Sequence, residues 1–137
     1  MRQRREGYFR WPLLFLAVWC LTSLPLAAAA DPLVTAHYSQ QRANAGMLQL
    51  AIAAPAPSPV IVSLNLPEGS DIVSASPGFK KRSKKNRQVK WLLKDVRPGS
   101  TTISFELSGP LSFSQLNCIV QYMDPAQGRM VTLKVTE

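Results

Sequence analysis

Residues 60–69 read VIVSLNLPEG, and this stretch indicates the class of fold. Every second residue from Val60 to Leu66 is apolar, which is the period of a β-strand with one buried face. The Pro-Glu-Gly that follows is a signal for a tight turn. The stretch therefore predicts a half-buried strand that ends in a chain reversal.

The same two-residue period recurs along the chain between turn signals rich in Pro and Gly. It predicts strands at residues 48–52, 60–66, 89–94, 101–107, 118–123 and 131–135, with weaker ones at 33–40 and 71–76. Residues 40–46 suit either a short helix or a loop. Seven or eight short strands at spacings of about ten residues predict an all-β fold, a single immunoglobulin-like antiparallel sandwich. A small closed barrel has the same alternation and stays open as the alternative.

The first thirty residues have the features of an export signal. Four arginines precede an apolar run at residues 13–26, which ends in four alanines before Asp31. This order is typical of a cleaved signal peptide. We therefore predict a signal peptide at residues 1–30, one sandwich domain at 31–137, and a periplasmic, secreted or cell-surface location.

Three other interpretations of the N-terminus fit less well. Cys20 lacks the small preceding residues of a lipoprotein signal, and Arg4-Arg5 lacks the bulky apolar pair that follows a twin-arginine motif. Residues 13–30 could span a bilayer as an uncleaved anchor, since a spanning helix needs about 17–25 residues. Pro25 and the small residues before Asp31 favour cleavage instead.

One cysteine, Cys118, remains after the signal, so the domain has no internal disulfide and depends on an apolar core. Cys118 shares a strand face with Val120 and Tyr122, which predicts a buried thiol. An intermolecular disulfide would need the opposite face to point inward. Trp91 lies on the apolar face of the strand at 89–94 and is expected in the core rather than in a ligand platform.

Four segments share features with a known kind of domain: residues 62–69 (VSLNLPEG), 72–77 (IVSASP), 89–91 (VKW) and 96–105 (VRPGSTTISF). They resemble bacterial extracytoplasmic immunoglobulin-like modules, in which a strand ends in a Leu-Pro-x-Gly turn, a later strand carries a Trp, and a Pro-Gly turn opens the next long strand. The resemblance implies a spacer, adhesive unit or assembly subunit without catalytic residues. This chain departs from the pattern in a basic segment before its Trp strand.

Positive charge is concentrated in that basic segment. Without residues 1–30 the chain has twelve Lys and Arg against seven Asp and Glu, a net charge of +5. Six of the twelve cations fall within eight positions: Lys80, Lys81, Arg82, Lys84, Lys85 and Arg87. Because like charges repel, we predict an extended, solvated hairpin loop between the strand ending near residue 76 and the strand starting near residue 88.

We predict that this loop docks to an anionic partner in the envelope: a protein, an anionic polymer or lipid headgroups. Export argues against nucleic acid. Phe79, at the base of the loop, suits either insertion into a headgroup layer or capping of the core. The alternative is that the charges only keep a sheet edge soluble. The chain is then a purely structural subunit of a surface assembly.

As a structural subunit, the domain would contact another copy or another protein through the edge or the face of a sheet. Ile61, Leu92, Ile119 and Met123 are apolar at positions where the alternation predicts exposure, so they could form a contact patch. Burial beneath the proline-rich segment 53–59 is the competing explanation.

No catalytic, metal or cofactor site is expected. His37 is the only histidine of the chain, and no Ser or Cys lies near it in a frame typical of nucleophilic catalysis. One Cys, one His and dispersed acids do not make a metal site. We therefore predict a module that is not an enzyme and has no small-molecule substrate.

Overall fold

The structure is a computed structural model that describes residues 31–135; the predicted signal peptide lies outside the described residues. The strands are β1 (Val34–Arg42), β2 (Ala45–Ile52), β3 (Val60–Asn65), β4 (Ile72–Ser76), β5 (Lys81–Ser83), β6 (Gln88–Leu93), β7 (Gly99–Leu107), β8 (Asn117–Asp124) and β9 (Arg129–Val135). A single 3-10 turn, Phe113–Gln115, precedes β8. Within residues 31–135, no helix has the length and hydropathy needed to cross a membrane.

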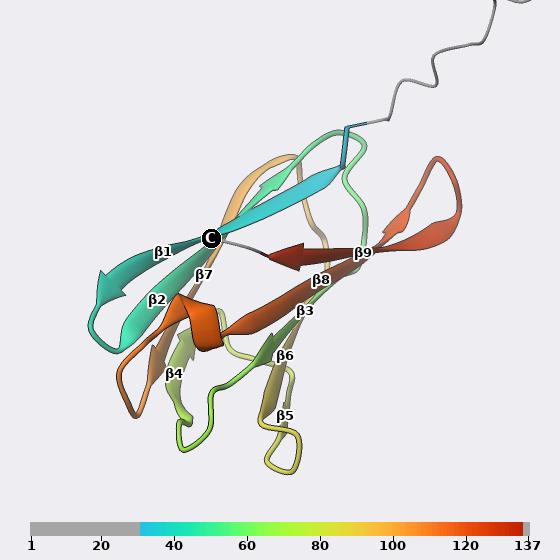
Figure 1. Cartoon of the computed structure of the whole chain (residues 1–137). Helices are drawn as coiled ribbons and strands as arrows, with labels where there is room; N and C mark the ends of the chain where they lie inside the picture. The colour runs from blue at the N-terminus through green and yellow to red at the C-terminus, as the bar shows by residue number, and fades with distance from the viewer. Residues whose placement is uncertain (1–30, 136–137) are drawn as a thin grey trace, which may run out of the picture. The chain divides into compact units, whose positions relative to one another are not determined.

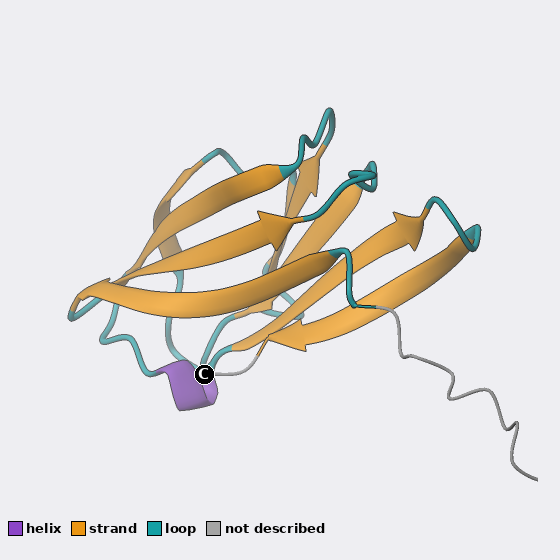
Figure 2. Ribbon diagram, turned by 90° about the horizontal axis from the view of Figure 1, so that it is seen from above, coloured by secondary structure: helices purple, strands orange, loops and turns teal. Residues whose placement is uncertain are grey.

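Two antiparallel sheets pack face to face (Figures 1 and 2). One sheet has the order β1-β2-β7-β4 and the other has the order β5-β6-β3-β8-β9. This arrangement confirms the predicted antiparallel sandwich. The small barrel is wrong, because no strand ladder of the described residues joins one sheet to the other.

All eight predicted strands are present, and β5 is an additional one inside the basic segment. Residues 40–46 form no helix, because they belong to the β1–β2 hairpin. The Asn44 side chain, in the turn of this hairpin, binds the hairpin to the neighbouring strand β7. Its amide donates to Glu106 Oε1 at 3.1 Å and to the Leu107 carbonyl at 3.2 Å.

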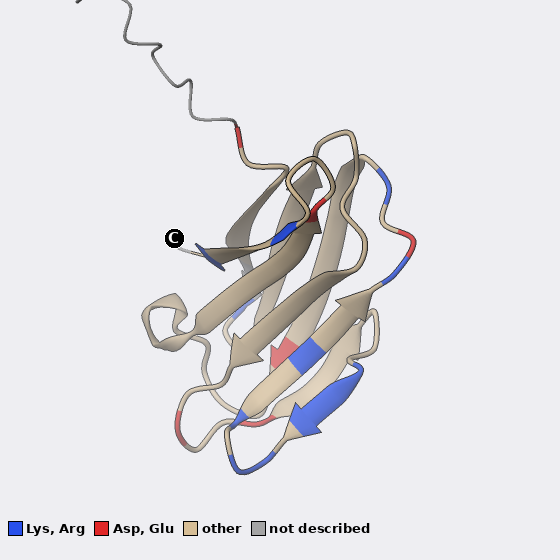
Figure 3. Cartoon of the chain, turned by 90° about the vertical axis from the view of Figure 1, so that its right-hand side faces the viewer, with Lys and Arg blue, Asp and Glu red and all other residues tan. Residues whose placement is uncertain are grey.

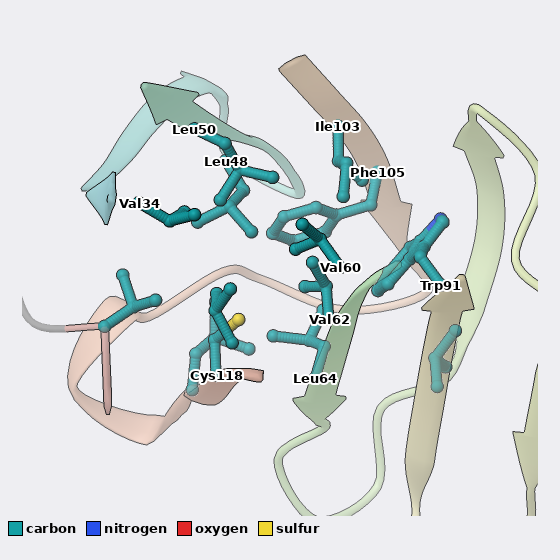
Figure 4. Close-up of a cluster of buried hydrophobic side chains, with 14 of the residues drawn as sticks. Val34, Leu48, Leu50, Val60, Val62, Leu64, Trp91, Ile103, Phe105 and Cys118 are labelled. Carbon is teal, nitrogen blue, oxygen red and sulfur yellow. The ribbon is translucent and has the colours of Figure 1, made fainter. Parts of the chain in front are cut away.

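The core lies between the sheets and is made of the alternate side chains that the sequence pattern marks (Figure 4). Trp91 is 1% exposed and Cys118 is fully buried, so both predictions of burial are confirmed. The Trp91 indole N–H donates to the Pro77 carbonyl at 2.9 Å. Phe79 packs edge-on against Trp91, with ring centroids 6.5 Å apart, and therefore caps the core. Insertion of Phe79 into a headgroup layer stays a prediction.

The two sheets meet at two seams. At one seam β1 contacts β9, and these are the first and last strands of the domain. At the other, β5 of the five-stranded sheet lies near the start of β4, where Arg82 forms an ion pair with Asp71. The predicted basic segment is therefore on the seam that lies away from the terminal strands.

Candidate functional site

The basic segment folds as a hairpin, which we call the basic hairpin: β5, turn residues 84–87 and the start of β6. β5 pairs with β6 so that Lys81 faces Lys90 and Ser83 faces Gln88. Arg87 closes the turn with a positive φ of 48°, and its N–H donates to the Lys84 carbonyl at 3.3 Å. These contacts hold the cations on a regular two-stranded support.

The predicted extended loop between the strands at 71–76 and 89–94 is wrong in two respects. β4 and β6 belong to different sheets, so no hairpin joins them; the chain crosses from one sheet to the other before β5 begins. Three residues of the basic segment, Lys81–Ser83, then pair with β6. Pairing satisfies the backbone polar groups, and strand alternation sends successive cations to opposite faces, which separates their charges.

One side of the basic hairpin faces a cleft of about 260 Å³ beside the β3–β4 loop. Arg82, Lys84 and Arg87 line this cleft together with Asp71. The Arg82 guanidinium donates to Asp71 Oδ2, and the other Asp71 oxygen accepts the N–H of Ile72 at 2.8 Å. Arg82 is thus partly neutralised, and it joins the two sheets at this seam.

The other side of the basic hairpin is the outer face of the five-stranded sheet. Lys81 and Lys90 lie directly opposite each other there, beside a cleft of about 140 Å³. The remaining lining residues, Ser83, Asn86 and Gln88, are uncharged hydrogen-bonding residues. No acidic side chain lines this cleft, so it carries net positive charge.

The six predicted cations therefore divide among four settings. Arg82 is paired, Lys84 and Arg87 line the seam cleft, and Lys81 lies on the sheet face. Lys80 and Lys85 are exposed (Figure 3 shows Lys and Arg gathered on β5 and its turn).

Sequence reasoning missed one member of this surface, Lys90. A signal was available, because Lys90 alternates with Val89 and Trp91 and must therefore face outward. Its pairing with Lys81 depends on the position of β5, which the sequence pattern did not reveal.

Other candidate residues have structural surroundings. His37 is exposed on β1, and its Nε2 makes a hydrogen bond of 3.0 Å with Gln49 Oε1. Burial raises the pKa of the Cys118 thiol to about 12, so the thiol stays protonated at neutral pH. Burial also raises the pKa of the nearby Tyr38 hydroxyl. Residues 31–135 contain no group of three or more His, Cys, Asp or Glu arranged to hold a metal ion.

The predicted apolar patch is only partly exposed. Ile61 faces Leu92 across two strands, and both are half-buried, as is Ile119. Met123 is 41% exposed and lies opposite Met130, which is 52% exposed. Contact of this face with a partner stays a prediction.

Comparison with known proteins assigns no family, since neither a family model nor a curated protein matches the chain. Two solved structures are similar in fold, each at 12% sequence identity. The solution structure of the chitin-binding domain of a hyperthermophilic chitinase from Pyrococcus furiosus matches 74% of this chain and 95% of its own, with a TM-score of 0.49. The crystal structure of ChBD2 from Thermococcus kodakarensis KOD1 matches 72% and 91%, with a TM-score of 0.45. Similarity at this level assigns no function, and the resemblance to bacterial immunoglobulin-like modules stays a prediction.

Proposed function

We propose that this chain is an exported, non-catalytic binding module of the cell envelope that docks to an anionic partner through the basic hairpin. One observation carries the proposal. Of the six cations, Arg82 has an ion-pair partner, whereas the other five have no acidic partner among the described residues. Those five are Lys80, Lys81, Lys84, Lys85 and Arg87.

Their arrangement is unfavourable without a counterion. Lys81 and Lys90 face each other directly, and like charges in this position destabilise a strand pair. Protecting a sheet edge from aggregation requires only an inward or edge-facing charge or two. A dense anionic partner compensates the whole set, and in an exported protein such partners are envelope polymers, acidic proteins and lipid headgroups. Chitin, named for the two similar structures, is a neutral polymer and does not account for this charge.

A structural role is the second candidate, and one observation favours it. β9 is hydrogen-bonded to β8 only, although β1 contacts it, and the exposed Met123–Met130 pair lies at the start of its ladder with β8. A strand from another copy or another protein could pair with this edge. In that case the basic hairpin would serve only solubility.

Capture from envelope extract distinguishes the two candidates. The test variant replaces Lys80, Lys81, Lys84 and Lys85 with Gln and Arg87 with Asn. Asn suits the positive φ at position 87, and Arg82 is left in place because it joins the sheets. The control variant replaces Lys94, Arg97 and Arg129 with Gln and so removes cations outside the basic hairpin.

We expect the natural protein and the control to capture a partner at low salt and release it at high salt, since exposed charges are screened. The test variant should capture nothing while its melting temperature stays unchanged. Capture by the test variant equal to that of the natural protein, persisting at high salt, would contradict docking by charge and support the structural candidate.

A further inference from the structure

We infer that the anionic partner is a polysaccharide that lies across the outer face of the five-stranded sheet, on a row of lysines that begins in the basic hairpin. This inference rests on the proposed function and names the class of its ligand. Its starting point is the strand register, which extends the cationic surface beyond the basic segment.

One straight row crosses all five strands. Lys81 faces Lys90, Lys90 faces Ser63, Ser63 faces Ile119, and Ile119 faces Lys134. Lysines therefore occupy the two ends of the row, and its middle holds Ser63, which is 5% exposed, and the half-buried Ile119. At about 4.8 Å between neighbouring strands, this lysine row is about 19 Å long from β5 to β9. A row of that length can contact several units of an extended polymer, whereas a single small anion would occupy only a small part of it.

The β5 end of the lysine row is suited to an oxyanion. Lys81 and Lys90 repel each other, and an anion placed between them removes that repulsion. Ser83, Asn86 and Gln88 line the same cleft and supply hydroxyl and amide groups. Hydrogen bonds from charged donors to an oxyanion are among the strong ones.

A second row runs parallel to the first and consists of uncharged polar residues. Ser83 faces Gln88, Gln88 faces Asn65, and Asn65 faces Asn117. The Gln88 amide donates to Asn65 Oδ1 at 3.0 Å, and Asn117 Oδ1 is buried, so only the remaining donors and acceptors of the row can meet a ligand. Amide side chains both donate and accept, as sugar hydroxyls do, so this amide row can bind the uncharged part of a glycan.

The face favours a hydrated polymer over a membrane or a protein. The turn residues 84–87 carry no apolar side chain, and Phe79 is committed to the core, so nothing in the basic hairpin anchors in lipid. Protein interfaces are built around an apolar centre depleted of charge, whereas Ile119 is the only apolar member of the two rows, and Ile61 and Leu92 beside them are half-buried.

The charge of this face is unbalanced, unlike that of the other sheet. Asp124 is the only acid in the five strands, and its carboxylate accepts the N–H of Ala126 in the β8–β9 turn. The strands of the four-stranded sheet contain no lysine and include Glu106. The polyanion is therefore expected on one face only.

The test uses residues of the lysine row that lie away from the predicted loop. Lys90→Gln with Lys134→Gln is compared with Lys94→Gln with Arg97→Gln, which removes the same charge outside the row. Protein is purified from cells expressing the full chain. Its affinity is measured for heparin, for uncharged dextran, for poly-glutamate and for phosphatidylglycerol vesicles.

We expect the natural protein to bind heparin and not dextran, and to bind poly-glutamate and the vesicles at least about tenfold more weakly, since each lacks the sugar hydroxyls. The Lys90/Lys134 variant should lose about tenfold or more in heparin affinity, the loss of one to two charge-assisted contacts. The Lys94/Arg97 variant should change by less than about threefold, because its cations act only through screened charge. Unchanged melting temperatures show that the variants are folded.

Two results would overturn the inference and leave the proposed function intact. In the first, the Lys90/Lys134 variant binds heparin like the natural protein while the five-substitution hairpin variant does not. In the second, poly-glutamate or the vesicles bind as tightly as heparin. If the natural protein binds none of the three anionic probes, the proposed function fails as well.

Discussion

Replacing Asp71 with Asn tests whether the charge of Arg82 contributes to binding, because the change removes a negative charge beside the basic hairpin and alters the stability of the fold little. Asp71 holds Arg82 in an ion pair and also accepts the N–H of Ile72 through Oδ1 at 2.8 Å. Asn keeps that acceptor and removes only the negative charge. The Arg82 guanidinium is thereby released to face the seam cleft, where a ligand anion can reach it.

The two expected effects have opposite signs. Stability should fall by about 0–1 kcal/mol, the range for solvent-exposed ion pairs, since the Arg82 and Asp71 side chains are 29% and 53% exposed. Polyanion binding should tighten instead. One added cation about 4 Å from an anion contributes about 1 kcal/mol in water, and screening at physiological salt reduces this to roughly 0.6 kcal/mol. That gain corresponds to about threefold in affinity.

The assay is fluorescence anisotropy with labelled heparin at low and physiological salt. Asp95→Asn is the matched control: it removes the same charge, Asn tolerates the positive φ of 55° at this position, and it lies beyond the far end of β6. Six strand residues separate it from the turn by about 20 Å, well over one Debye length. If Asp71→Asn binds heparin no more tightly than Asp95→Asn, Arg82 adds nothing to the docking surface and the argument from charge is refuted.

Three further predictions concern the core. Gly46→Ala should lower the free energy of unfolding, measured by urea titration, by about 1–2 kcal/mol. A Cβ at this position would lie 2.9 Å from the Phe105 ring, and this overpacking outweighs the gain of about 0.5–1 kcal/mol from removing a strand glycine. Equal or greater stability of the variant would contradict this prediction. Trp91→Phe should cost about 2 kcal/mol, since it leaves the Pro77 carbonyl without its donor and creates a void, and a loss below about 0.5 kcal/mol would contradict the packing argument. The Cys118 thiol should resist a thiol reagent at pH 8 until the protein is unfolded. The free energy of unfolding should fall as pH rises from about 9 towards 12, because only the thiol of the unfolded protein ionises at its ordinary pKa. Rapid labelling of the folded protein would contradict burial of the thiol.

The positions of the strands along the chain were predictable where one face of the strand is apolar. Val60, Val62 and Leu64 of β3 alternate with outward residues, and the structure buries all three. The pattern is local, so it could be detected without knowing which strands are neighbours.

β5 escaped prediction because it has no apolar face. Its residues are Lys81, Arg82 and Ser83, and its strand conformation depends on pairing with β6 rather than on its own composition. The division of strands between sheets was equally hidden. β4 and β6 are close in sequence but belong to different sheets, which only long-range contacts determine.

The candidate site was therefore located correctly in the chain but not in its geometry. The run of cations was visible, whereas the ion pair of Arg82 depends on the position of Asp71, directly before β4 of the other sheet. Lys90 and Lys134 belong to the same surface because of the strand register, and a periodic sequence pattern does not determine which residues face each other.

The contact of β1 with β9 at one seam has a practical consequence for any attachment. A dye, bead or sensor surface joined near the start of β1 or the end of β9 is separated from β5 by the width of the five-stranded sheet, about 19 Å. Immobilisation through either terminal strand therefore leaves the basic hairpin accessible to a ligand in solution.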